Sequence, residues 1–252
     1  TWYNMGQFEK AEQLFVKAKQ IREKQLGKEH RDYAAACNNL ASLYFEMNQY
    51  EKAELLCLEA KNILEKIEKN EPVDYALTCN NLASLYSSKG RYEEAESLSL
   101  SAKEILEKFI GKEHPEYGTC CEARAINYQN MGAYQRAEPL YLEAKQTSER
   151  SLGKLNPEYG KLCTQLAGLY WVKHQPSDAA KELKEAFAVD EYNLDAIFKF
   201  TNEKEKADFI KNISGQGDKA YSFYAAEKLS AEQPYALSLF HRNLILSASQ
   251  AL

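Results

Sequence analysis

Residues 37–44 and 79–86 carry the same string, Cys-Asn-Asn-Leu-Ala-Ser-Leu-Tyr, at an offset of 42 residues. When residues 31–72 are aligned on residues 73–114 without a gap, 24 of the 42 positions are identical. Self-similarity at one fixed spacing predicts a repeat architecture, in which each unit is a small motif that stacks on the next.

The same offset organises most of the chain. It superimposes one alanine from each unit, namely Ala11, Ala53, Ala95, Ala137 and Ala179. The offset predicts an array over residues 1–189, composed of a truncated unit (1–30), three full units (31–72, 73–114, 115–156) and a degenerate unit (157–189). Residues 190–252 lose the period but still read as helical, so we expect an aperiodic helical capping or connector segment there.

Each full unit is expected to form two helices. Between Asp32 and Met47 the apolar residues fall at helical spacing, and a second amphipathic stretch runs from Tyr50 to about Ile67. The break between the two stretches holds Gly90 or Gly132 in later units, which suits a left-handed helix end. One helical hairpin cannot bury its apolar stripe alone, so stacking is required and an all-α solenoid is predicted.

These residues resemble the tetratricopeptide repeat. The match rests on Leu40, Ala41, Tyr44, Tyr50, Ala53 and Ala60, and the 42-residue period with its Gly-Lys-Glu-His-Pro linker (residues 111–115) resembles the variant of kinesin light chains and many bacterial arrays. The resemblance implies a right-handed superhelical solenoid that acts as a protein–protein interaction scaffold.

The patterning of residues 190–252 resembles the connector that joins such repeats to a caspase-like peptidase domain, the CHAT domain, in bacterial proteins. This resemblance implies a regulatory or sensor segment of a larger bacterial CHAT-type protease, with its own C-terminal peptidase domain as one partner. The alternative is a stand-alone scaffold that binds an extended peptide or a cargo protein. Residues 1–7 align with 43–49, so the first unit lacks most of one helix. Either the chain was cut from a longer one, or another chain covers that face.

Composition argues against several other functions. The net charge of −5 gives no cationic surface for nucleic acid or an anionic membrane, and no apolar stretch approaches the ~18–20 residues of a membrane span. No signal peptide is evident, and six cysteines without a Cys-x-x-Cys motif favour unpaired thiols in a reducing, cytoplasmic setting. His30 and His114 occupy one linker position in two units and are interpreted as turn residues. We therefore expect no catalytic residue, cofactor or metal, and no enzyme activity of this chain.

The resemblance implies that a partner binds on the concave face, against the first helix of each unit. The candidate positions are Asn38, Ser42, Phe45, Glu46, Asn80, Ser84, Ser88, Glu122, Gln129, Asn130, Thr164 and Trp171. The carboxamides of Asn38 and Asn80 both donate and accept, so they suit the backbone of an extended peptide, or else they tie neighbouring helices together. Trp171 is either an aromatic anchor or the start of a C-terminal interface. Arg124 replaces a core leucine and is expected to reach solvent or to pair with Glu122 or Glu138.

Overall fold

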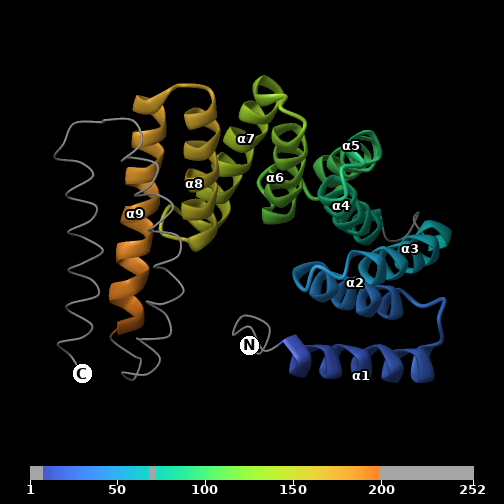
Figure 1. Cartoon of the computed structure of the whole chain (residues 1–252). Coiled ribbons are helices and arrows are strands. Elements are labelled where there is room, and N and C mark those ends of the chain that lie inside the picture. Colours follow the sequence, from blue (N-terminus) through green and yellow to red (C-terminus); the bar gives the residue numbers. More distant parts are fainter. Residues whose placement is uncertain (1–7, 68–71, 199–252) are drawn as a thin grey trace. The chain divides into compact units, whose positions relative to one another are not determined.

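The computed structural model describes residues 8–67 and 72–198, and these residues form nine α-helices and no strand (Figure 1). The helices are α1 (Phe8–Leu26), α2 (Arg31–Glu46), α3 (Tyr50–Ile67), α4 (Pro72–Ser88), α5 (Tyr92–Phe109), α6 (Pro115–Asn130), α7 (Tyr134–Leu152), α8 (Pro157–Val172) and α9 (Pro176–Phe198). The chain divides into two compact units at residues 151 and 152. The first contains α1 to α7 and the second α8 and α9.

The predicted repeat fold is confirmed. In the first unit α2 packs with α3 and α4 with α5, and in the second α8 packs with α9. The first helix of the unit over residues 31–72 runs from Arg31 to Glu46 and the second from Tyr50 to Ile67, within one residue of the expected bounds. Helix α9 continues to Phe198, past residue 189, and the rest of the predicted connector segment lies outside the described residues.

The turn between the two helices of a hairpin adopts the same conformation in the four units whose turns the structure describes. The backbone φ is 56° at Asn48, 75° at Gly90, 73° at Gly132 and 58° at His174, and these residues are spaced by the repeat offset. A positive φ costs a residue with a Cβ on the order of 1 kcal/mol, whereas glycine adopts it freely. The expected role of Gly90 and Gly132 as left-handed helix ends is therefore confirmed.

The linker histidines cap helices. His30 Nδ1 accepts a hydrogen bond from the backbone N–H of Asp32 at 3.1 Å, and His114 Nδ1 accepts one from Glu116 at 3.3 Å. Asn156 does the same for α8, through its Oδ1 and the N–H of Glu158. Each cap satisfies one of the free donors at a helix start, so the interpretation of these histidines as turn residues is confirmed.

None of the six cysteines forms a disulfide, and all six are buried. Burial, as the largest cause, raises the pKa of Cys37 to about 12, and the pKa values of Cys57, Cys120 and Cys121 are raised to about 12 for the same reason. These thiols therefore behave as small core residues. Within the described ranges, every helix is too short or too polar to cross a bilayer.

Candidate functional site

The first helices of the hairpins form a row in the first unit. Helix α4 contacts both α2 and α6, so these three helices lie next to one another. Their apolar stripes, for example Ala41 and Leu43 of α2, are buried in the hairpin cores. Two hollows lie along the boundary between α2 and α4.

The first hollow has a volume of about 180 Å³ and lies where α2, α3 and α4 meet. It is lined by Ala41, Ser42, Phe45, Glu46, Ala53, Cys57, Asn81, Ser84 and Leu85. Four of these are buried apolar residues, whereas Ser42 and Glu46 are exposed. The hollow thus combines apolar walls with a polar, negatively charged edge.

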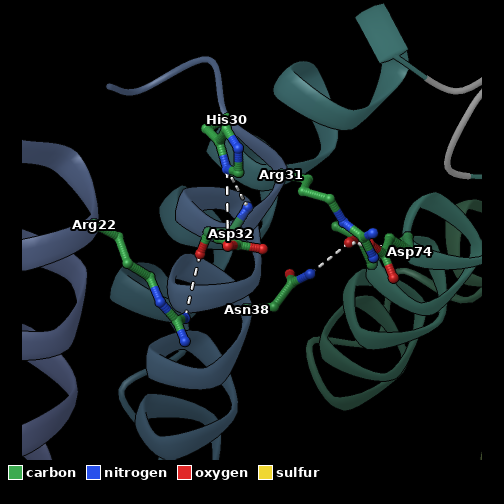
Figure 2. Close-up of polar contacts among 7 residues, drawn as sticks. Arg22, His30, Arg31, Asp32, Asn38 and Asp74 are labelled. Carbon is green, nitrogen blue, oxygen red and sulfur yellow. Dashed lines mark hydrogen bonds and ion pairs between the residues drawn. The ribbon is translucent and has the colours of Figure 1, made fainter. Parts of the chain in front are cut away.

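The second hollow has a volume of about 140 Å³ and lies between the N-terminal halves of α2 and α4. Its lining includes Arg31 and Asp74, which form an ion pair with an N–O distance of 2.6 Å, so its charges are neutralised internally (Figure 2). Asn38 also lines it and points toward α4, where its Nδ2 donates to Thr78 Oγ1 at 2.5 Å (Figure 2).

The predicted partner-binding residues fall into different environments. Ser42, Glu46, Ser88, Asn130 and Thr164 are exposed, and Asn38, Phe45, Ser84, Gln129 and Trp171 are half-buried. Asn80 and Glu122 are only 5% and 4% exposed. Four of the predicted residues line the first hollow: Ser42, Phe45, Glu46 and Ser84.

Two carboxamides of the row tie neighbouring helices. Besides the bond from Asn38 to Thr78, Asn130 Nδ2 of α6 donates to Ser87 Oγ of α4 at 3.2 Å. The Oδ1 atoms of Asn38 and Asn80 are buried and accept no hydrogen bond. The interhelical role left open for Asn38 is therefore the one that its donor group performs.

Three serine hydroxyls of the row donate their protons within their own helices. Ser42 Oγ donates to the carbonyl of Asn38, and Ser84 Oγ donates to that of Asn80, each at 3.1 Å. Ser88 Oγ donates to the carbonyl of Ser84 in the same way. Since a hydroxyl has one donor and two lone pairs, each of these serines has only acceptor capacity left for another group.

A separate polar network joins α2 and α3 and also reaches α1. Tyr33 of α2 donates to Glu59 of α3 at 2.7 Å, and Lys19 of α1 forms an ion pair with the same carboxylate at 3.0 Å. Burial alone would raise the pKa of Glu59, but the Tyr33 hydrogen bond and the Lys19 charge outweigh it, so the pKa lies below its ordinary value. The same arrangement recurs two repeats further on with Tyr117 and Glu143.

Among the described residues, the second unit contains a group of three side chains spaced as metal ligands could be. The ligand atoms of Cys163, Glu182 and Glu185 lie within 4.8 Å of one another. However, Glu185 accepts a hydrogen bond from Tyr159 and lies 3.9 Å from Cys163 Sγ, as Glu59 does with Tyr33 and Cys37. We therefore interpret Cys163 and Glu185 as members of the repeated hairpin network.

Arg124 lies among buried residues and is itself 9% exposed. Its Nη2 is 3.4 Å from the hydroxyl of Tyr128, which in turn donates to Glu96 at 2.7 Å. The sequence had suggested solvent or a pair with Glu122 or Glu138, so this tyrosine-mediated route to Glu96 differs from both expectations. The repeat alignment places Arg124 at the position of Leu40 and Leu82. It did not indicate the contact through Tyr128 to Glu96, because Glu96 belongs to the preceding hairpin.

Comparisons with known proteins agree with this architecture. Sequence models of the tetratricopeptide repeat match residues 3–66, 76–116 and 119–158. No curated protein matches the sequence. Among solved structures, BtubC (BKLC) from P. vanneervenii superimposes with a TM-score of 0.70 at 18% identity, covering 99% of this chain and 93% of that one.

Further structures show the same fold at low identity. Nearly identical TPR-like repeats from P. anserina give a TM-score of 0.60 at 24% identity, over 76% of this chain and 91% of that chain. A Rap protein complexed with competence and sporulation factor gives 0.65 at 12% identity, over 99% and 73% of the two chains. The Rap conjugation gene regulator of plasmid pLS20, solved with a peptide, gives 0.64 at 12% identity, over 99% and 72%.

The fold defines the chain as a helical-repeat protein, in which helical hairpins stack as in a solenoid. The family matches identify the units: the chain is built from tetratricopeptide repeats.

Proposed function

We propose that this chain is a protein-interaction module that binds an extended polypeptide segment along the row formed by α2, α4 and α6. The observation that carries the proposal is the position of the two hollows, which both follow the boundary between α2 and α4. Their lining includes residues that are not buried in the hairpin cores, such as Ser42, Glu46 and Asn81. Side-chain hollows spaced along an open face suit a segment that inserts individual side chains.

The structural relatives support the same function. Two Rap proteins of this fold were solved in complex with a peptide or with competence and sporulation factor. At 12% identity the likeness extends to the fold alone, so the binding face proposed for this chain rests on its own hollows.

A displayed library of random nine-residue peptides, selected against the purified chain, tests the proposal. Enriched peptides should bind the wild type. Ser42→Tyr, which fills the first hollow from an exposed position, should lower their affinity at least tenfold. Ser101→Tyr is the matched control, because Ser101 is an exposed serine on the second helix of a hairpin. A library that yields no binding peptide would contradict the function, and equal binding to Ser42→Tyr would contradict the site.

We further propose that the array is the regulatory part of a larger CHAT-type bacterial protease of the cytoplasm. This finer proposal rests on the pattern of residues 190–252, most of which lie outside the described residues. Its test is the reading frame that follows the codon of Leu252, where a caspase-like domain with a His/Cys pair should be encoded. A frame without such a domain favours the stand-alone scaffold.

A further inference from the structure

We propose that the first hollow is a specificity pocket for a lysine or arginine side chain of the bound segment, with the Glu46 carboxylate as its counter-charge. The inference rests on the proposed function and adds the chemistry of the partner. It is carried by three properties of the hollow: its size, its acceptor-rich edge and the unused charge of Glu46.

The size suits one side chain. The volume of about 180 Å³ is below the ~300–1,000 Å³ of pockets that enclose small-molecule ligands. The apolar part of the lining consists of Ala41, Ala53, Cys57 and Leu85, each at most 3% exposed. Lysine and arginine bury their methylene stems against such surfaces while the charged end stays at the edge.

The edge of the hollow offers mainly acceptors. The hydroxyl protons of Ser42 and Ser84 are donated to backbone carbonyls of their own helices, which leaves lone pairs toward the hollow. Asn81 adds a carboxamide with both an acceptor and a donor. Ammonium and guanidinium groups carry donors and no acceptor, so they complement this set.

Glu46 supplies a carboxylate that has no charge partner among the described residues. It is exposed, and within the part of the chain that the structure describes it makes no hydrogen bond or ion pair. No lysine, arginine or histidine lines the first hollow, whereas the second hollow holds the Arg31–Asp74 pair. The two hollows therefore differ in charge, and only the first has a free carboxylate.

A neutral guest fits this arrangement less well. A leucine or phenylalanine side chain in the hollow would displace water from the Glu46 carboxylate without giving it a partner, which is unfavourable. A cation restores the lost interactions, and the ring of Phe45 adds a face on which a guanidinium can lie. An acidic guest would be repelled.

The test uses peptides selected from the random nine-residue library, resynthesised with a fluorescein label. Each is compared with a version in which arginine becomes citrulline or lysine becomes norleucine. Binding is measured to the wild type, to Glu46→Gln and to Glu104→Gln. Glu104 is the matched control, because it is an exposed glutamate on α5 that lies outside both hollows.

We expect the selected peptides to share a lysine or arginine at one position. Glu46→Gln should lower the affinity of these peptides about two- to fivefold, which is the effect of an ion pair at an exposed edge. Glu104→Gln should leave their affinity unchanged. The effect should vanish with the neutral peptides and shrink at high salt. A selection against Glu46→Lys should lose the shared cation.

Selected peptides without a shared cation, or peptides equally weakened by Glu46→Gln in charged and neutral forms, would overturn the inference and leave the peptide-binding function intact. A selection that yields no peptide at all would overturn both.

Discussion

The Tyr33 hydroxyl of α2 donates a 2.7 Å hydrogen bond to the Glu59 carboxylate of α3, and Lys19 of α1 reaches the same carboxylate from the preceding hairpin. One acid thus joins the two helices of a repeat and the repeat before it. The aligned positions Tyr117, Glu143 and Lys103 repeat the arrangement. In the unit between them the acid is replaced by Ser101, and Lys61 pairs with Glu65 of its own helix instead.

Glu59→Ser, which installs the residue found at position 101, should lower the free energy of unfolding by about 1–3 kcal/mol. The Tyr33 hydroxyl, on a side chain 1% exposed, would lose its acceptor, and a buried unsatisfied group costs that much. The measurement is urea unfolding followed by circular dichroism. Glu104→Ser, at an exposed site on α5, should change stability by less than about 0.5 kcal/mol.

Combining Glu59→Ser with Tyr33→Phe separates the hydrogen bond from other effects of the substitution. Because the phenylalanine leaves no hydroxyl to satisfy, the double variant should be less destabilised than the sum of the two single variants. Additive losses would show that the two groups do not interact.

The repeat offset predicted the helices and the turns between them, because both depend on local spacing and on a hydrophobic stripe. It did not decide whether Asn38 faces a partner or the next helix, since that depends on how closely α2 approaches α4. The near-complete burial of Asn80 and Glu122 has the same origin. The Tyr33–Glu59 network was missed, although a signal for it exists: Tyr33, Tyr117 and Tyr159 are each accompanied by a glutamate 26 residues later.

The first hollow was predicted only in part. The aligned first helices indicated Ser42, Phe45, Glu46 and Ser84, which all line it. They did not indicate Ala53 and Cys57, because these belong to the second helix of the hairpin and were assigned to the core. A pocket floor and a core share the same apolar pattern, so the sequence alone does not distinguish them.

Gly90→Ala should destabilise the protein by about 1 kcal/mol, whereas Gly168→Ala should stabilise it by about 0.5–1 kcal/mol. Gly90 has a φ of +75° that alanine resists, and Gly168 lies inside α8 with no atom within 4 Å of an added Cβ. Thermal unfolding of the two variants provides the test. A loss of stability in Gly168→Ala would mean that the position is crowded or non-helical in solution.

Acid should weaken the contact between α5 and α6 through Glu96. The hydrogen bond from Tyr128 and the charge of Arg136 hold the pKa of Glu96 below its ordinary value, although burial opposes them. A carboxyl with a lower pKa in the folded state adds stability above its unfolded pKa of about 4.3, and that stability is lost as the pH falls through the folded value. The wild type should therefore exceed Glu96→Gln in Tm at pH 6, and the difference should shrink toward pH 3. If the Tm difference between the two proteins stayed the same from pH 6 to pH 3, the substitution would act through packing and not through the charge of Glu96.

The six cysteines should resist thiol reagents in the folded protein. Their burial, and pKa values of about 12 at Cys37, Cys57, Cys120 and Cys121, leave little reactive thiolate at pH 7.5. Labelling with a disulfide reagent should be at least about 100-fold slower than in guanidinium chloride, where all six react, because each thiol waits for its repeat to open. Glu59→Ser should speed the labelling of Cys37, whose Sγ lies 3.8 Å from Glu59 Oε2, more than that of Cys163 in the second unit. One thiol that reacts at the denatured rate in the native wild type would contradict the burial on which this prediction depends.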